Sequence, residues 1–360
     1  MTPEEARAAF PVLEQYAYLN AGSVGPVARR TVEALERELE HDLEHGRGGA
    51  KRFERVLALR AQVRARLGAE LGVKASLVAL TSSTSESCRI VVAGLGLSPE
   101  DEIVTTDTEH FGLLGPVGAS GARVRVASVL ERPPAEAVDA ILAEIGPRTG
   151  LVALSHVAWT TGQVLPVAEL SAELEVPLLV DGAQSVGAIP IDAAPYDFYT
   201  VSGQKWLCGP DATGALYVRE PDRLSVALPG YLSQESYEPD GSFAPKPGAA
   251  RFDPGWLGAP SLAGLLAALD GLPEWRFERA AEMAARCREL LVDAGHDVVT
   301  EPGHATLVSW RAPHDPSQTV QQAHEAGVVI RELPRLGWLR ASCGWWTNDD
   351  DLERMLAVIA

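Results

Sequence analysis

Lys205 is the residue that the sequence most clearly singles out for chemistry. It stands in Ser202-Gly-Gln-Lys-Trp206, between the apolar run 198–201 and a glycine-rich turn. The chain has only four lysines, and the other three have ordinary surroundings in an arginine-rich helix, after a helix-ending glycine and between prolines (Lys51, Lys74 and Lys246). A lysine held among apolar, strand-like residues loses hydration, so its pKa falls and the neutral amine can form a Schiff base with a carbonyl group. We therefore predict that Lys205 is a catalytic amine.

A candidate acid, Asp181, directly follows the apolar run Leu178-Leu-Val180. Such a run is typical of a buried strand, and open α/β sheets bind ligands at the carboxyl ends of parallel strands. An acid at this place could keep a proton on the ring nitrogen of a cofactor. An Asp after a strand can also be a turn residue or a helix cap, so its position alone does not decide its role.

Residues 81–87, Thr-Ser-Ser-Thr-Ser-Glu-Ser, link a predicted strand to a predicted helix. Backbone N–H groups, hydroxyls and the helix dipole converge there and suit a phosphate dianion. Ser83-x-x-Glu86 is also an ordinary capping box. Ser202 and Gln204 could supply further phosphate donors. His110, after another predicted strand, could lie flat on a cofactor ring or be an ordinary surface or core histidine.

A reactive lysine, an acid for a pyridine nitrogen, an anion site and a flat stacking group are what pyridoxal 5'-phosphate (PLP) requires of a protein. We therefore predict PLP as the cofactor, with Lys205, Asp181 and His110 as catalytic residues. The four cysteines are scattered, with no CxxC pair and no histidine at metal-ligand spacing, so neither a metal site nor a disulfide framework is predicted (Cys88, Cys208, Cys287 and Cys343).

The elements that must position these residues follow an α/β pattern. Short apolar runs without polar alternation mostly alternate with helix-like stretches (77–80, 103–104, 124–126, 151–154, 178–180, 198–201 and 215–218). Such runs suit strands that are covered on both faces, so we predict a large domain with a mainly parallel seven-stranded sheet. Ahead of it, Thr2-x-x-Glu5 predicts a short capped helix, Pro26 a helix that ends at Gly46, and residues 53–67 an amphipathic helix up to Gly68.

Residues 230–255 are rich in Pro, Gly, Ser and Tyr without a clean period, which predicts a long loop between two domains. Helix-like stretches at 262–272 and 274–291, strand candidates at 305–310, 328–331 and 338–341, and a closing helix from Asn348 then predict a small α+β domain. We expect residues 1–17 to be an N-terminal segment packed with the small domain, 18–255 the large PLP-binding domain, and 256–360 the small C-terminal domain.

Charge and hydropathy exclude several classes of protein. The net charge of −18 opposes nucleic-acid phosphates and anionic membrane surfaces. The N-terminus lacks an apolar h-region, and no stretch approaches the roughly 18 apolar residues of a membrane span. We therefore expect a cytoplasmic protein that binds neither nucleic acid nor membrane.

These segments together resemble class V of the fold-type-I PLP enzymes, which contains cysteine desulfurases, cysteine/cystine carbon–sulfur lyases, isopenicillin N epimerases and several aminotransferases. The likeness runs from Tyr18 nearly to the C-terminus. Residues 180–185, Val-Asp-Gly-Ala-Gln-Ser, resemble the segment that supplies the ring-nitrogen Asp and a Gln for the phenolic oxygen, here Gln184. The segment around Lys205 resembles the Schiff-base segment. Thr84 and Ser85 match the phosphate loop, and His110 matches the stacking histidine.

The resemblance also implies a substrate site. Arg340-Ala-Ser342 resembles the segment whose arginine holds the substrate α-carboxylate. Asn20, Trp159 and Arg331 complete the predicted substrate-binding set, and Trp159 stands where desulfurases often carry an asparagine. This sequence departs from the family's pattern at three places. Ser83 replaces a usual glycine, Gln204 replaces a frequent histidine, and Gly255-Trp256 replaces a Gly-Thr whose threonine contributes to the partner subunit's phosphate site. Desulfurases also place a nucleophilic cysteine between the last two strands, and residues 332–337 contain none.

The segments 84–91 and Glu109-His-Phe-Gly and the short connection from Arg331 to Arg340 most resemble the cysteine/cystine lyase branch of this class. The resemblance implies a carbon–sulfur lyase that acts by β-elimination on cystine or cysteine, with cystine favoured, and gives pyruvate, ammonia and a sulfide or persulfide. Arg331 lies nine residues before Arg340, so in an antiparallel pair the two could sit side by side and Arg331 could receive the second carboxylate of cystine. It could equally be a surface arginine paired with Glu332. An aminotransferase or epimerase shares the first proton abstraction and stays an alternative, as does a PLP-binding scaffold with little turnover. The resemblance implies a homodimer acting on a small amino acid.

Overall fold

The computed structural model describes residues 2–130 and 132–359. Its helices are α1 (Pro3–Ala8), α2 (Arg29–His45), α3 (Ala50–Glu70), α4 (Thr84–Leu95), α5 (Phe111–Ala119), α6 (Pro134–Ala143), α7 (Val167–Glu173), α8 (Ala259–Asp270), α9 (Arg276–Asp293), α10 (Pro316–Glu325) and α11 (Asp349–Ile359). Its strands are β1 (Ala17–Tyr18), β2 (Val78–Thr81), β3 (Glu102–Thr106), β4 (Arg123–Ala127), β5 (Thr149–Ser155), β6 (Leu178–Asp181), β7 (Phe198–Ser202), β8 (Gly214–Val218), β9 (Gln234–Tyr237), β10 (Phe243–Pro245), β11 (Leu307–Arg311), β12 (Val328–Val329), β13 (Arg331–Leu333) and β14 (Trp338–Ser342).

Seven strands form the central sheet, in the order β2-β8-β7-β6-β5-β3-β4. β8 runs antiparallel to both of its neighbours, β2 and β7, and the other six strands all run in one direction. Side chains alternate between two cores: along β5, Leu151 and Ala153 pack with α4 and α5, whereas Val152 and Leu154 pack with α3, α6, α7 and α8. The sheet is therefore covered on both faces, which explains the continuous apolar runs. The predicted α/β fold with a mainly parallel seven-stranded sheet is confirmed.

The N-terminal helices differ slightly from the prediction. α1 carries the predicted capping box between Thr2 and Glu5. α2 ends at Gly46 as predicted but begins at Arg29, three residues after Pro26. The Gly25 N–H donates to the Gln204 carbonyl (2.8 Å) and Ala28 keeps an extended backbone, so this stretch cannot yet turn into a helix. α3 continues two residues past Gly68.

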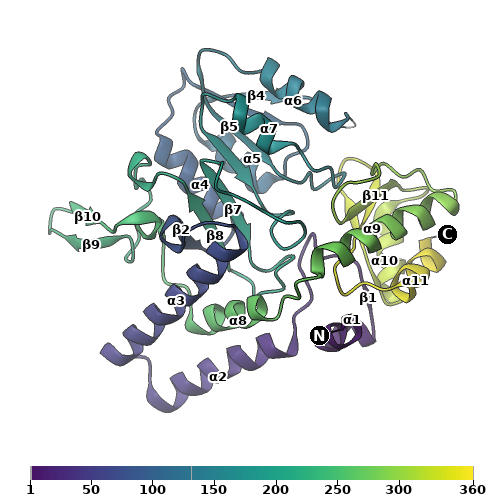
Figure 1. Ribbon diagram of the computed structural model, residues 1–360, viewed down its shortest axis with the longest axis horizontal. Helices are drawn as coiled ribbons and strands as arrows, with labels where there is room; N and C mark the ends of the chain where they lie inside the picture. Colours follow the sequence, from purple (N-terminus) through teal and green to yellow (C-terminus); the bar gives the residue numbers. More distant parts are fainter. Residues whose placement is uncertain (1, 131, 360) are drawn as a thin grey trace.

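The C-terminal lobe lies beside the sheet, and Figure 1 shows its strands grouped with α9, α10 and α11 near the C-terminus. β11, β14 and β13 form an antiparallel sheet, and β12 pairs in parallel with β1 from the start of the chain. The single strand predicted over 328–331 is therefore wrong: Ile330 separates two short strands that belong to different sheets. The strands at 307–311 and 338–342 and the final helix agree with the prediction.

Residues 230–255 are not a plain loop. They contain the antiparallel hairpin of β9 and β10 and a 3-10 turn at Gly248–Phe252. Figure 1 shows this hairpin projecting on the side of the sheet away from the C-terminal lobe. Its strands are mostly exposed and β10 ends in Pro245, so they lack the apolar alternation that would have predicted them.

The division into domains at residue 255 stays a prediction. α8 packs with α2 and α3, and its buried side chains join the core of the large sheet, whereas α9 joins the core of the C-terminal lobe. We therefore propose that the domain boundary lies between α8 and α9. The N-terminal segment contacts the C-terminal lobe, where Phe10 packs on Trp345 and Trp346.

No helix in the described part of the chain combines the length and the apolar composition that crossing a membrane requires.

Candidate active site

Asp181 is the last residue of β6 and lies at the carboxyl edge of the parallel strands. It is buried, and its Oδ1 accepts hydrogen bonds from the Ala183 N–H and the Thr200 hydroxyl, both at 2.9 Å. No described residue donates a hydrogen bond to Oδ2. One carboxylate oxygen is thus fixed by the protein, and the other is available to a ligand.

Lys205 follows β7 in a tight turn that is closed by hydrogen bonds from Cys208 N to the Lys205 carbonyl (3.1 Å) and from Gly209 N to the Gly203 carbonyl (2.8 Å). Burial lowers the pKa of the Lys205 ammonium to about 8. The negative charge of Asp181 opposes that shift, and the positive charges of Arg340 and Arg331 reinforce it. Lys51 and Lys74, by contrast, are exposed. Neutral amine is consequently accessible at Lys205 near physiological pH.

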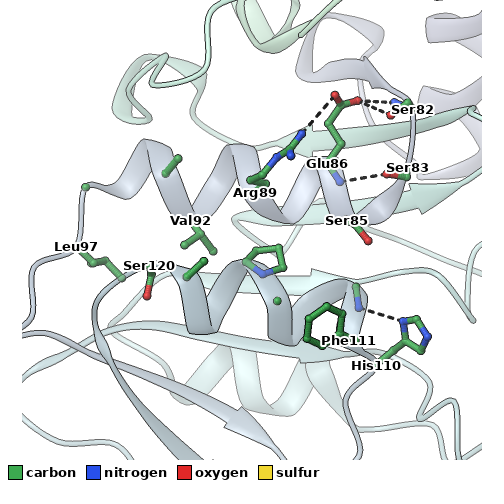
Figure 2. A pocket seen from close by; sticks show the side chains of 16 residues that line it. Ser82, Ser83, Ser85, Glu86, Arg89, Val92, Leu97, His110, Phe111 and Ser120 are labelled. Atoms are coloured by element: carbon green, nitrogen blue, oxygen red, sulfur yellow. Dashed lines mark hydrogen bonds and ion pairs between the residues drawn. The ribbon is translucent and has the colours of Figure 1, made fainter.

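The start of α4 forms an anion cradle. Ser83 is the N-cap, and its Oγ accepts from the Glu86 N–H (3.2 Å). Glu86 reaches back to the N–H and hydroxyl of Ser82 rather than to Ser83, at 2.7 and 2.8 Å (Figure 2). The amide N–H groups of Thr84 and Ser85 donate to no described residue, so this helix N-terminus presents two amides and two hydroxyls to an anion.

Ser202 and Gln204 lie beside the lysine and interact with each other. The Ser202 hydroxyl donates to Gln204 Oε1 at 2.9 Å, which leaves the Gln204 amide N–H groups as the donors of this pair. The pair can therefore bind an anion through Gln204, with Ser202 orienting its amide.

His110 caps α5, and its Nδ1 accepts from the Gly112 N–H at 3.0 Å, as Figure 2 shows. A Cβ on Gly112 would lie 2.8 Å from Ser85 Oγ and 3.3 Å from His110 Nδ1, so the histidine and the anion cradle are neighbours. Burial is the first cause that lowers the pKa of His110, followed by the charge of Lys205. Trp159 meets the His110 ring edge-on, with centroids 5.2 Å apart.

A buried carboxylate, Glu109, braces this region. It accepts from Thr106 Oγ1 (2.6 Å), Ser155 N (3.0 and 3.1 Å) and Ser155 Oγ (2.5 Å). Burial raises the pKa of Glu109 to about 7 in spite of these donors. Since Ser155 is the register partner of Asp181, Glu109 ties the loop that carries His110 to the strand end beside the acid.

Arg331 and Arg340 are directly opposed on β13 and β14, as the nine-residue spacing predicted. Arg340 is fully buried, and its Nη1 donates to the Trp159 carbonyl at 2.8 Å. The Cζ atom of Arg331 lies over the Trp159 ring, 5.7 Å from its centroid. Burial, and then the charge of Arg331, lower the pKa of Arg340 to about 9. Among the described residues no carboxylate forms an ion pair with either guanidinium, and Arg340 Nε is buried without a partner.

The predicted site residues therefore lie around one place. Three predicted residues, Gln184, Asn20 and Trp256, make contacts within the chain that the sequence did not indicate. The side-chain amide of Gln184 is bonded to the Gly22 carbonyl (2.8 Å) and to Trp206 Nε1 (3.0 Å), so it has one N–H left for the phenolic oxygen. The Asn20 side chain contacts Ser23 (2.7 Å) rather than either arginine. Trp256 stacks on Phe53, and its contact with a partner subunit stays a prediction.

Two residues were missed by sequence reasoning. Ser23 hydrogen-bonds to both arginines, and Thr200 holds Asp181. The sequence signals were small: a serine three residues after Asn20 in a glycine-rich segment, and a threonine inside the otherwise apolar β7.

Comparison with known proteins agrees with this geometry. The aminotransferase class-V family model matches residues 17–298. The chain belongs to the aminotransferase class-V family. Isopenicillin N epimerase from Streptomyces clavuligerus is 29% identical, over 98% of this chain and 96% of that protein.

Two solved structures of C-DES are similar over almost the whole chain. One is a C-DES variant with glycine covalently linked to the PLP cofactor, at 29% identity and a TM-score of 0.91 over 98% of both chains. The other is the cystine C–S lyase C-DES in complex with its reaction product cysteine persulfide, at 29% identity and a TM-score of 0.90 over 97% of this chain and 98% of that chain. The protein is a PLP-dependent enzyme of class V with the fold-type-I architecture.

The residues present fit PLP. The two free amides at the start of α4 suit its phosphate, the free Oδ2 of Asp181 suits its ring nitrogen, and the Lys205 amine suits its aldehyde. We propose Thr84, Ser85, Ser202 and Gln204 as phosphate-side residues and His110, Asp181, Gln184 and Lys205 as ring-side residues.

Proposed function

We propose that this class V enzyme is a carbon–sulfur lyase that eliminates the sulfur substituent from the β-carbon of cystine or cysteine. The observation that carries the proposal is the pair of guanidinium groups, Arg331 and Arg340, that converge beside Lys205 without a carboxylate partner among the described residues. Two neighbouring guanidinium groups repel each other, and a bound anion stabilises them. Cystine has two carboxylates, one for each arginine.

The cysteines support elimination over sulfur transfer to the enzyme. All four thiols are buried, and the connection between β13 and β14 has no cysteine. Cys343 belongs to the core of the C-terminal lobe, and its hydrogen bond to Cys287, followed by burial, raises the pKa of its thiol. A protonated, buried thiol is a poor nucleophile, so sulfur would leave as a sulfide or persulfide.

Each residue then has a distinct task. Arg340 holds the α-carboxylate, with Asn20 and Trp159 shaping the same wall. Lys205, as the neutral amine, removes the proton from Cα. With PLP bound, Asp181 would keep the ring nitrogen protonated and His110 would lie against the ring. When bound, PLP supplies the electron sink for the pair left on Cα. Departure of sulfur from Cβ and hydrolysis then give pyruvate and ammonia.

Two arginine substitutions test the proposal. Arg340→Ala should lower kcat/KM for every amino acid, whereas Arg331→Ala should lower it for cystine and spare cysteine. A charge-assisted hydrogen bond contributes about 1.5–3 kcal/mol, so the selective loss should be roughly ten- to a hundredfold. Pyruvate and sulfide are measured under anaerobic conditions. Arg335→Ala is the matched control, because it removes an exposed guanidinium from the same connection. Equal losses for both substrates in Arg331→Ala would make Arg331 structural.

The similarity to isopenicillin N epimerase favours one alternative, epimerisation at Cα. An epimerase would exchange the α-proton with solvent deuterium and invert the stereocentre without forming pyruvate. A transaminase would instead consume a keto acid. A broad amino-acid panel read for pyruvate, deuterium exchange and keto-acid dependence distinguishes all three reactions, and absence of turnover on the whole panel would point to a scaffold.

A further inference from the structure

Ser23 lies in a strap of chain, residues 17–25, that crosses from the C-terminal lobe to the large sheet. On the lobe side, Ser342 N donates to the Leu19 carbonyl at 2.8 Å. On the sheet side, Gln184 Nε2 donates to the Gly22 carbonyl and Gly25 N donates to the Gln204 carbonyl, both at 2.8 Å. Ser23 is therefore fixed from both sides.

The Ser23 hydroxyl uses its full hydrogen-bonding capacity. Its oxygen accepts from Arg331 Nη1 at 2.8 Å and from Arg340 Nη2 at 3.5 Å, and its proton is donated to Asn20 Oδ1 at 2.7 Å. A hydroxyl has one proton and two lone pairs, so Asn20 takes the proton and leaves both lone pairs to the guanidinium groups. Ser23 is thus the point on which the two cations converge.

This convergence creates a choice for an incoming substrate. Two guanidinium groups that reach the same oxygen are close enough to grip a single carboxylate together, and opposed like charges favour any anion placed between them. If Arg331 joined Arg340 on the α-carboxylate, it would be unavailable to a second carboxylate. Glu332 does not hold the Arg331 guanidinium in an ion pair, because the Glu332 carboxylate accepts a hydrogen bond from the Ser317 hydroxyl at 2.5 Å.

We infer that Ser23 is a specificity-determining residue: its oxygen occupies the point between the two guanidinium groups, which keeps Arg331 from joining Arg340 on the α-carboxylate and leaves Arg331 to the second carboxylate of the substrate. This inference rests on the proposed substrate class but not on the reaction. Without the hydroxyl, Arg331 loses its acceptor at 2.8 Å and both arginines can close on one carboxylate. Preference for diacids should then disappear while binding of single carboxylates persists.

Ser23→Ala holoenzyme tests this with ligands that cannot react. The probes are suberate, in which as many chain atoms separate the carboxylates as in cystine, and its half-amide, which has the same length and one carboxylate. Dissociation constants are measured by isothermal titration calorimetry. The unmodified enzyme should prefer suberate by roughly ten- to a hundredfold, and Ser23→Ala should reduce that ratio below about threefold.

Tyr18→Phe is the matched control. The Tyr18 hydroxyl donates to the Val24 carbonyl at 3.0 Å, so its removal loosens the strap next to Ser23 without touching either arginine. It should keep the preference for suberate. If Ser23→Ala fails to fold or to retain PLP, Ser23→Gly removes the same hydroxyl without adding a methyl group and is measured in its place.

The outcomes separate this inference from the proposed reaction. An unchanged ratio in Ser23→Ala, an equal drop in Tyr18→Phe, or no diacid preference in the unmodified enzyme overturns it. A collapse of the ratio confined to Ser23→Ala supports it, even if the enzyme releases no pyruvate from cystine or cysteine. In that case the lyase reaction fails and the diacid specificity remains.

Discussion

Lys205 differs from the other lysines of the chain in its surroundings. Its turn is set between β7 and β8, and desolvation shifts the pKa of its amine to about 8. The same principle applies to Arg340, which is fully buried, and burial is the first cause that lowers its pKa. Groups like these are held in a poorly solvated state until a ligand compensates their charge.

The lowered pKa of Lys205 predicts how cofactor attachment depends on pH. Only the neutral amine attacks the PLP aldehyde, and a lowered pKa makes that form dominant above about pH 8. The rate of covalent attachment to the apoenzyme should therefore rise about tenfold per pH unit below pH 8 and level off above it. Stopped-flow absorbance after mixing with PLP measures the rate. A rate that still climbs steeply at pH 10 would indicate an ordinary solvated lysine.

Asp181→Asn should keep PLP bound but lower turnover by several powers of ten. The amide oxygen can still accept from Ala183 and Thr200, so the local fold survives. A neutral side chain cannot keep the ring nitrogen protonated, and each pKa unit of lost stabilisation corresponds to roughly 1.4 kcal/mol. Visible absorbance checks cofactor retention, and steady-state assays give kcat/KM. Near-normal turnover would refute the assigned role.

The residues found from sequence share a local signal, whereas those that were missed do not. Asp181 and Lys205 each follow an apolar run, so their chemistry is visible against their neighbours. Ser23 acquires its role only because the strap, β13 and β14 meet in space, more than three hundred residues apart in the chain. No local pattern contains that information.

The same distinction holds for strands and helices. The seven sheet strands were predictable because double-sided burial leaves continuous apolar runs. The split of β12 from β13 and the delayed start of α2 depend on distant partners, namely β1 and Gln204. The hairpin of β9 and β10 is exposed, so burial imposes no pattern on it.

One buried carboxylate, Asp253, joins α3 and β2 to the end of the 3-10 turn at Gly248–Phe252. It accepts from Arg60 (2.7 Å) and Arg64 (2.8 Å) on α3 and from the Leu80 N–H (2.8 Å) on β2. Asp253→Ala would leave two guanidinium groups unpaired, so the free energy of unfolding should fall by about 3–5 kcal/mol.

Urea unfolding measures this loss. Asp222→Ala is the control, because it also breaks an arginine contact (2.7 Å to Arg251) but its side chain is 89% exposed, which limits the expected loss to about 1 kcal/mol or less. Similar losses in the two variants would show that the contacts of Asp253 with Arg60, Arg64 and Leu80 stabilise the fold no more than an exposed ion pair does.

The whole molecule places its chemistry where the two lobes and the strap meet. Lys205 and Asp181 come from the sheet, the arginines from the C-terminal lobe, and Ser23 from the strap that passes between them. Large apolar side chains are exposed on the large domain. Phe111 lies at the rim of a groove of about 880 Å³ between α4 and α5, and Trp256 stacks on Phe53.

These exposed side chains support the prediction of a homodimer. Exposed apolar surface of this kind favours association. Sedimentation velocity at micromolar concentration should give twice the chain mass of 38.4 kDa. A fully active monomer under the same conditions would remove the dimer from the account.

We assign Lys205 as the amine that carries PLP. Sodium borohydride reduction of the purified holoenzyme makes the bond between cofactor and lysine permanent. Mass spectrometry of the digested protein then identifies the modified peptide. We predict a single PLP modification on Lys205, and a Lys205→Ala protein that binds PLP only reversibly and carries no label. A label on Lys51, Lys74 or Lys246 in the unmodified protein would contradict the assignment on which the site, the proposed reaction and the order of its steps depend.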